Sequence, residues 1–167
     1  MNDKGFTLIE LIVVIVILGI LAVTAVPKYI NLKADAQTST LYGVKAAMEG
    51  ASALVYGKSI VKGNQNLSAS NSPKPTITLT NGTSLDIGYG YPIVPPPIPG
   101  LGDPVAYWTN LLDLSDSYAV RVATNGALLV YLTGMDIPTD VSDPCVAIYQ
   151  APTNALKKPD IRVNKCL

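Results

Sequence analysis

A single apolar segment, residues 6–26, constrains this chain more than any other feature of its sequence. It reads FTLIELIVVIVILGILAVTAV; 17 of its 21 residues are apolar, and Glu10 is its only charged residue. A helix of this length spans roughly 31 Å, about the thickness of the hydrocarbon core of a bilayer. A core helix of a globular domain normally keeps a polar stripe, and this segment has none. We therefore predict a membrane-embedded helix.

The composition excludes several classes of function. The chain has 167 residues, about one domain, and its 12 basic residues balance 12 acidic ones, so nothing favours binding to nucleic acid. It has no histidine and only two cysteines. Serine–histidine and cysteine–histidine nucleophiles, histidine-ligated zinc, four-thiolate zinc and iron–sulfur clusters are thereby excluded. We expect a protein that is not an enzyme and needs no cofactor.

The possible interpretations of the apolar segment differ in whether they explain Glu10. A secretory signal peptide cut after Ala25 has small residues at the right places, but the preceding MNDKG is weakly basic and Glu10 has no use in targeting. A simple anchor helix leaves Glu10 unexplained as well. A carboxylate within a membrane helix costs about 2–3 kcal/mol even on lenient scales, so it normally has a function and a partner.

Residues 5–10, GFTLIE, resemble the class III signal of type IV prepilins, and this resemblance implies a partner for Glu10. The resemblance implies cleavage between Gly5 and Phe6 on the cytoplasmic side, methylation of the new Phe6 amine, and retention of the apolar helix. The cationic amine would then lie about one helical turn from Glu10. The resemblance also implies that Glu10 pairs with the amino terminus of a neighbouring subunit and so sets the register of a filament, because a misplaced subunit would leave a charge unpaired.

The helix is expected to change character after the apolar segment. Gly19 and Pro27 match positions where the helix of this family bends or unwinds, and Pro27 alone predicts a kink or a break. Beyond it, apolar residues recur at helical spacing and predict an amphipathic helix over 27–58, ended by Gly57 and Gly63. This stripe consists of Leu41, Val44, Met48, Ala51 and Val55.

The rest of the chain is expected to form a head rich in β-strands. Strands at Thr76–Leu79 and Leu85–Ile87 flank Asn81-Gly82, a hairpin signal. A two-residue loop there would mix the faces of the strands, so either a bulge corrects the register or the strands do not pair directly.

A second hairpin signal is clearer. Tyr118–Ala123 and Ala127–Leu132 surround Asn125-Gly126, and a two-residue turn would pair Val122 with Leu129. This register predicts an apolar face that packs on the helix.

Between the hairpins, the proline-rich residues 91–100 predict a rigid surface crossing, because proline cannot donate to a central strand. Trp108 is expected to anchor the core rather than to stack on a sugar.

Cys145 and Cys166 enclose 20 residues near the C-terminus. A translocated head lies in an oxidising compartment, and type IV pilins carry a C-terminal disulfide, so the resemblance implies that these two cysteines are joined. Val146–Tyr149 and Ile161–Val163 are expected to be strands of the disulfide-framed region.

Asp136, Asp140 and Asp143 form a loose acidic group just before this region. Calcium takes oxygen ligands from such loops, and pseudopilins of the wider family bind it, but no known calcium-loop spacing is present. We expect a solvated acidic surface and no metal site.

These observations predict an α+β protein with a type IV pilin fold: a long N-terminal helical spine packed on an antiparallel β-sheet head with a C-terminal disulfide. The expected parts are a leader (1–5), an apolar membrane or filament-core helix (6–26), an amphipathic helix (27–58), a head (59–167) and a disulfide region (145–166).

The expected function is that of a structural pilin subunit. The precursor would lie in the inner membrane, meet the prepilin peptidase and the pilus assembly machinery, and join copies of itself in an extracellular pilus for surface attachment, with motility left open. LKADAQ (32–37) and GVKAAMEGASALVYGKS (43–59) most resemble the mannose-sensitive haemagglutinin (MSHA) pilins. The alternatives are a pseudopilin of a type II secretion system and a secreted globular binding protein cut after Ala25.

Overall fold

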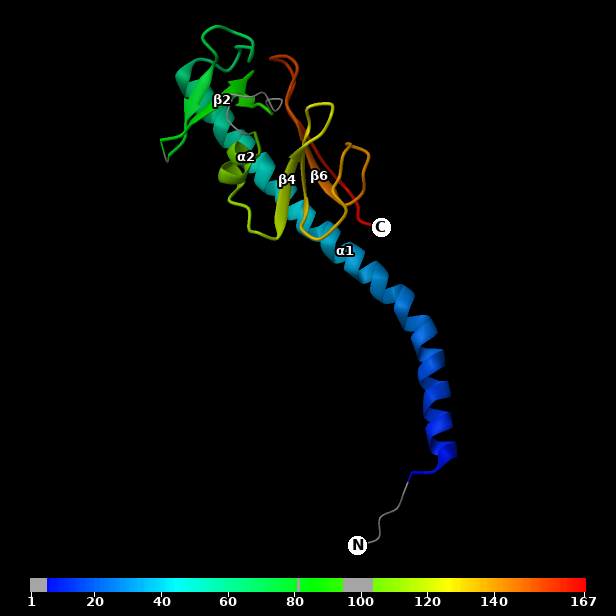
Figure 1. Cartoon of the computed structure of the whole chain (residues 1–167). Helices are drawn as coiled ribbons and strands as arrows, with labels where there is room; N and C mark the ends of the chain where they lie inside the picture. Colours follow the sequence, from blue (N-terminus) through cyan, green and yellow to red (C-terminus); the bar gives the residue numbers. More distant parts are fainter. Residues whose placement is uncertain (1–5, 81, 95–103) are drawn as a thin grey trace.

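One helix, α1 (Leu8–Lys62, 55 residues), forms the axis on which the other elements are arranged (Figure 1). This computed structural model describes residues 6–80, 82–94 and 104–167, apart from the side chains of residues 26, 27, 30, 31 and 104. The N-terminal half of α1 stands alone, and its C-terminal half carries the head. All side chains from Phe6 to Ala25 are exposed.

Of the two predicted ends of the helix, Gly63 is correct and Gly57 is not. The helix α1 continues past the expected bound at residue 58 to Lys62 and stops at Gly63, which has a left-handed backbone (φ 72°). Gly57 costs the helix only about 1 kcal/mol. The turn beyond it is held in place: the buried hydroxyl of Ser59 donates to Asn64 Oδ1 (2.7 Å), and Lys62 Nζ donates to the Thr76 carbonyl (2.9 Å).

Pro27 does not break α1. The backbone is helical from Leu8 to Lys62, and Figure 1 shows a bend between the apolar segment and the part under the head. A proline inside a helix removes one hydrogen bond and crowds the carbonyl four residues earlier, so a bend is the expected response of a helix that does not break. Gly19 is also helical.

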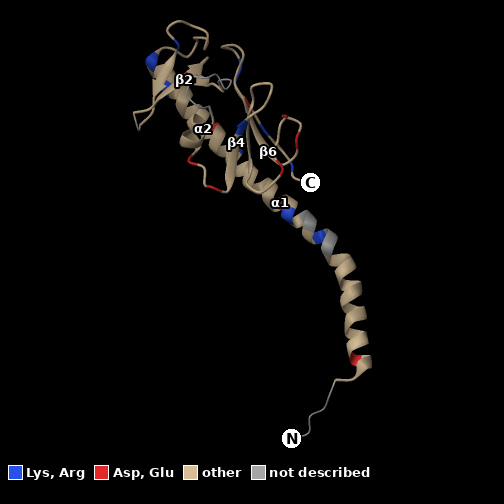
Figure 2. Ribbon diagram, in the orientation of Figure 1, with Lys and Arg blue, Asp and Glu red and all other residues tan. Residues whose placement is uncertain are grey.

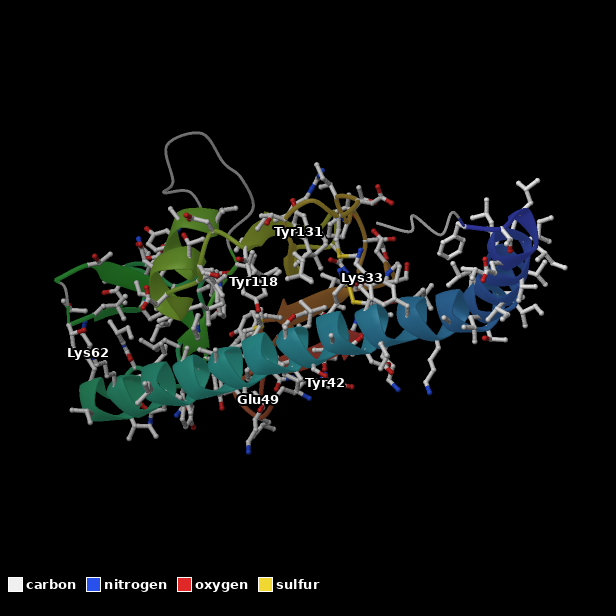
Figure 3. All side chains as sticks on the ribbon, turned by 90° about the horizontal axis from the view of Figure 1, so that it is seen from below. Lys33, Tyr42, Glu49, Lys62, Tyr118 and Tyr131 are labelled. Atoms are coloured by element: carbon white, nitrogen blue, oxygen red, sulfur yellow. A yellow bond between two sulfur atoms is a disulfide. The ribbon has the colours of Figure 1, made fainter. Side chains whose placement is uncertain are left out.

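The predicted apolar stripe holds the head. Leu41, Val44, Met48 and Val55 are buried, and Ala51 is half-buried. Figure 3 shows Tyr42 and Glu49 on the side of α1 away from Tyr118 and Tyr131. The amphipathic half of the helix therefore has one side in the core and one side open.

The described part of the head contains two antiparallel sheets and a short helix. The first sheet has the order β1-β2-β3, the second has the order β4-β5-β6-β7, and helix α2 lies between them in the chain. The strands are β1 (Thr76–Thr78), β2 (Ser84–Gly88), β3 (Tyr91–Pro92), β4 (Tyr118–Val122), β5 (Leu128–Leu132), β6 (Val146–Gln150) and β7 (Asp160–Asn164), and α2 is Pro104–Leu112.

The hairpin β4–β5 has a register one residue away from the predicted one. Val122 lies opposite Leu128, not Leu129, and the Ala123 N–H donates to the Ala127 carbonyl (2.8 Å). The loop therefore has three residues, and Gly126 takes the left-handed conformation (φ 79°) of a turn with a glycine bulge.

This register decides which side chains reach α1. Leu128 and Val130 join the core cluster that contains Leu41 and Met48, whereas Leu129 lies in a second cluster on the other face of the sheet. The predicted packing of an apolar hairpin face on α1 is confirmed. Val122 of β4 packs against this cluster as predicted, whereas Leu128 of β5 takes the place of the predicted Leu129.

The hairpin β1–β2 follows the same rule. Thr78 pairs with Ser84, and the Leu79 N–H donates to the Thr83 carbonyl (2.8 Å). Gly82 is left-handed (φ 81°), and Asn81 lies outside the described residues. The strands thus pair directly through a longer loop, which is the bulge alternative.

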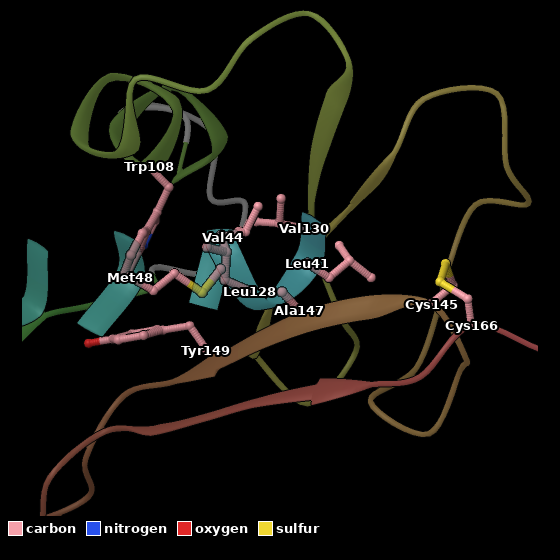
Figure 4. Packing of buried hydrophobic residues seen from close by; sticks show 10 residues of the cluster. All are labelled: Leu41, Val44, Met48, Trp108, Leu128, Val130, Cys145, Ala147, Tyr149 and Cys166. Atoms are coloured by element: carbon pink, nitrogen blue, oxygen red, sulfur yellow. A yellow bond between two sulfur atoms is a disulfide. The ribbon is translucent and has the colours of Figure 1, made fainter. Parts of the chain in front are cut away.

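Trp108 of α2 anchors the core, as expected. It is 1% exposed, and its ring lies 4.3 Å from that of Tyr149, centroid to centroid (Figure 4). Its Nε1–H donates to the Ile93 carbonyl (3.3 Å), and the Tyr149 hydroxyl donates to the Pro92 carbonyl (2.8 Å). Burial raises the pKa of the Tyr149 hydroxyl, so it remains a neutral donor.

The predicted proline-rich crossing is described only in part. Tyr91 and Pro92 form the short edge strand β3, a position that proline tolerates. Residues 95–103 lie outside the described residues.

Deleting residues 1–30 should yield a soluble, folded, monomeric head. The deletion removes the exposed apolar half of α1 and keeps the stripe that packs on the sheets. Size-exclusion chromatography and circular dichroism measure this outcome. Filaments formed by the truncated chain would show that assembly does not depend on the apolar helix.

Candidate functional site

Glu10 lies in a capping box at the start of α1. Its Oε2 accepts hydrogen bonds from the Thr7 backbone N–H (2.9 Å) and the Thr7 hydroxyl (2.8 Å), while the Glu10 N–H donates to Thr7 Oγ1 (3.3 Å). This arrangement satisfies two N–H groups that an uncapped helix would leave free, and it places a negative charge at the positive end of the helix dipole.

The role of Thr7 is absent from the sequence-based predictions. Threonine followed three residues later by glutamate, directly before an apolar run, is the pattern of a capping box. That signal was available within the GFTLIE motif. Two groups of its own chain thus donate hydrogen bonds to the Glu10 carboxylate, and among the described residues it forms no ion pair.

Phe6 precedes the cap and is 82% exposed. A shallow hollow beside Glu10 is lined by Phe6, Ile9, Val13 and Val14. Gly5, the other residue of the predicted cleavage site, lies outside the described residues. The structure therefore describes the C-terminal side of that peptide bond and leaves the cleavage a prediction.

The apolar helix around Glu10 has the length and composition of a membrane span. Leu8–Ala25 has a mean hydropathy of 3.0, and none of it is buried by the rest of the chain. In Figure 2, the helix has no charged position between the acidic one near its start and the lysines below the head. An exposed apolar surface of this kind needs lipid or another protein surface to cover it.

The predicted disulfide is confirmed: Cys145 and Cys166 are bonded. It joins the start of β6 to the chain just after β7, and both predicted strands of this region are present. The Cys166 N–H donates to Thr38 Oγ1 of α1 (3.0 Å), so the C-terminal end of the head is tied directly to the helix.

The acidic residues before β6 serve their own loop. The carboxylate of Asp143 accepts hydrogen bonds from the backbone N–H groups of Thr139 (2.7 Å) and Asp140 (3.0 Å), which lower the pKa of Asp143. Asp140 Oδ1 accepts from the Ser142 N–H (3.0 Å). Within the described part of the chain, no three acidic or thiol side chains gather as ligands of a metal ion, and Asp136 adds no third ligand.

Comparison with known proteins points to the same N-terminal chemistry. Residues 1–26 match the family described as the prokaryotic N-terminal methylation motif. A fimbrial protein of Pseudomonas aeruginosa is 41% identical over 89 residues, which cover 50% of this chain and 53% of the relative. The type IV narrow pilus major component PilA5 of Thermus thermophilus is 46% identical over 54 residues, which cover 32% of this chain and 47% of the relative.

The chain thus spans about half the length of the curated relatives it matches. No solved structure matches it significantly. The long apolar helix, the antiparallel sheets and the C-terminal disulfide form an α+β architecture consistent with the type IV pilin fold.

Replacing both cysteines by serine should lower the free energy of unfolding of the truncated head by about 3 kcal/mol, because the disulfide closes a chain segment with a sequence separation of 21. Urea denaturation measures the change, and reduction of the unmodified head with dithiothreitol is the control. An unchanged denaturation midpoint in both cases would contradict the stabilising role.

Proposed function

We propose that this chain is a structural subunit of a type IV pilus and assembles through its apolar N-terminal helix. The observation that carries the proposal is the combination of a fully exposed apolar half-helix, interrupted only by Glu10 at its start, with a head attached to the other half. The methylation motif over residues 1–26 and the similarity to fimbrial proteins support it. A subunit of this kind is not an enzyme and needs no cofactor.

The proposed processing begins with cleavage between Gly5 and Phe6 by a prepilin peptidase at the inner membrane, followed by methylation of the Phe6 amine. Cleavage there removes the polar leader and keeps the whole apolar helix. The pilus assembly machinery then moves the subunit from the membrane into the extracellular pilus. Gly19 and Pro27 are the proposed points at which α1 bends or unwinds during packing, since both lower the cost of leaving the regular helix.

Glu10 is the residue that we propose sets the axial register between neighbouring subunits in the filament. In the isolated subunit, Thr7 supplies its hydrogen bonds. In the filament, the cationic Phe6 amine of a neighbour would also balance its charge. Surrounding subunits would exclude water from this pair, so a misplaced subunit would leave a charge unpaired in apolar surroundings, at a cost of about 3–5 kcal/mol.

Within the type IV pilins, we propose that the chain is of the MSHA type and that its filament serves attachment to surfaces. The segments 32–37 and 43–59 carry this finer assignment. The competing assignment, a pseudopilin, predicts short periplasmic assemblies. Electron microscopy of filaments sheared from the cell surface distinguishes the two.

The mature chain should begin at Phe6 and carry one added methyl group. Intact mass and N-terminal peptide sequencing of the purified protein measure this. A chain that begins at Val26 would be shorter by the 20 residues from 6 to 25, and it would establish a secreted protein with a conventional signal peptide instead.

Glu10→Ala should leave membrane insertion intact and strongly reduce filament assembly. Removing the carboxylate favours insertion by up to about 3 kcal/mol, whereas the loss of a buried ion pair costs assembly about 3–5 kcal/mol. The ratio of sheared filament protein to membrane-fraction protein measures the effect.

Glu10→Gln provides the control for this prediction, because glutamine can still complete the capping box with Thr7 but carries no charge. We expect it to be nearly as damaging as Glu10→Ala. Normal assembly of Glu10→Gln would assign the role of Glu10 to capping the helix, and the ion-pair explanation would be wrong.

A further inference from the structure

The turn between β6 and β7, residues 151–159, presents an apolar side chain beside two lysines. Leu156 is 98% exposed, and Lys157 and Lys158 follow it and are also exposed. The turn is held in shape by Asn154: its Oδ1 accepts from the Leu156 N–H (3.0 Å), and its carbonyl accepts from the Lys157 N–H (3.3 Å). These two hydrogen bonds hold the backbone of the tip, which lowers the conformational entropy that it would lose on binding.

Neither lysine of this turn forms an ion pair with another described residue. Lys158 shares a hollow with Glu49 and Asp160, but these two carboxylates already have cationic partners. Glu49 lies 3.7 Å from Lys45 Nζ, and Asp160 pairs with Arg162. The turn therefore carries two positive charges that its own head leaves unbalanced.

The loop between β5 and β6, residues 133–145, has the complementary character. It surrounds a hollow of about 430 Å³ whose lining includes Met135, Ile137 and Pro144. Ile137 is 60% exposed. Three aspartates lie on this loop, and the loop has no basic residue. Lys165, just after β7, lies next to the end of the loop, because its carbonyl accepts a hydrogen bond from the Cys145 N–H.

The acidic hollow and the basic turn cannot meet within one chain, because they lie at opposite ends of β6. Five strand residues separate them, a distance of roughly 17 Å. Figure 1 shows the turn after β6 toward the C-terminal end of α1 and the loop before β6 toward the C-terminus of the chain. Figure 2 shows acidic positions on the loop and basic positions on the turn.

The two features are also displaced along α1. Met135 of the hollow lies beside Gln37 (Sδ to Nε2, 3.7 Å), whereas Lys158 of the turn shares its hollow with Glu49 and Tyr56. Positions 37 and 49–56 are roughly 18–28 Å apart along a helix. If a second copy of the chain is shifted along the helix axis by about 18–28 Å, its acidic hollow lies at the same height as the basic turn of the first copy.

From this arrangement we infer that the basic turn of one subunit docks into the acidic hollow of a neighbouring copy, with Leu156 as the apolar tip. The inference rests on the filament proposed above. The contact joins two different surfaces of the same chain, and such heterologous contacts generate open helical assemblies when they do not close into a ring. The apolar helix would supply most of the buried area, and the charges of the two loops would set the partner and its orientation.

Charge reversal tests this contact in cells that assemble the full-length protein. One variant carries Lys157→Glu and Lys158→Glu, a second carries Asp136→Lys and Asp140→Lys, and a third combines all four changes. The measurement is the ratio of sheared filament protein to membrane-fraction protein. We expect each double reversal to lower this ratio at least about tenfold, because like charges then face each other. The combined variant should return to within about threefold of the unmodified chain.

A matched single reversal tests whether any lost charge has this effect. Arg121 is exposed on β4, outside both loops, so Arg121→Glu should assemble normally where Lys157→Glu alone is impaired. Equal losses in these two variants, or no recovery in the combined variant, would overturn the contact. Normal assembly of both double reversals would overturn it too and leave the pilus proposal intact. Absence of filaments from the unmodified chain would overturn the pilus proposal itself.

Discussion

The rest of this structure depends on the uncovered apolar surface of the N-terminal half of α1. An 18-residue apolar span with no packing partner among the described residues of its own chain costs free energy in water along its whole length. Only lipid or other protein surfaces can cover it, and copies of the same helix are the surfaces that assembly would provide. The head contributes by keeping this half of the helix apart: the four-stranded sheet packs on Leu41, Val44 and Met48, the three-stranded sheet packs on Val55, and residues 8–25 are left free.

Glu10 is a charged residue within this apolar surface, and its carboxylate costs free energy there. The capping box with Thr7 reduces the cost, because the carboxylate has two hydrogen-bond donors and lies at the positive end of the helix. It does not neutralise the charge. A carboxylate that is hydrogen-bonded but unbalanced can exist in a single subunit in the membrane, yet it gains from a cation once water is excluded. In the proposed filament, the same carboxylate would therefore be hydrogen-bonded in the single subunit and would also be neutralised after assembly.

The long apolar helix is predicted correctly because it depends on length and composition alone, and the disulfide is predicted correctly through the family resemblance. Cleavage and methylation at Phe6 stay predictions. The amphipathic stripe is also predicted correctly, because its period is read directly. Helix α2 escaped prediction even though Asp103-Pro104 before Val105 and Trp108 is a helix-start pattern. The β4–β5 register was wrong for a different reason: Asn125-Gly126 fits two- and three-residue loops equally well. What selects the longer loop is the fit of Leu128 and Val130 against α1, a tertiary contact that no local pattern contains.

The pairing of β6 with its two neighbouring strands determines where the two charged loops lie. Because β6 is paired on both sides, with β5 and β7, its ends cannot move relative to each other, and the acidic hollow and the basic turn are held at a constant separation. The disulfide adds a tie at the acidic end, where the Cys166 N–H bonds to Thr38 of α1. The two charged loops on the surface of the head are therefore fixed in position along the axis of α1. In the proposed filament, a neighbouring subunit would have to pair with Glu10 in the apolar core and with the charged loops at the periphery at one and the same axial shift. Two such conditions restrict the register more strongly than either alone.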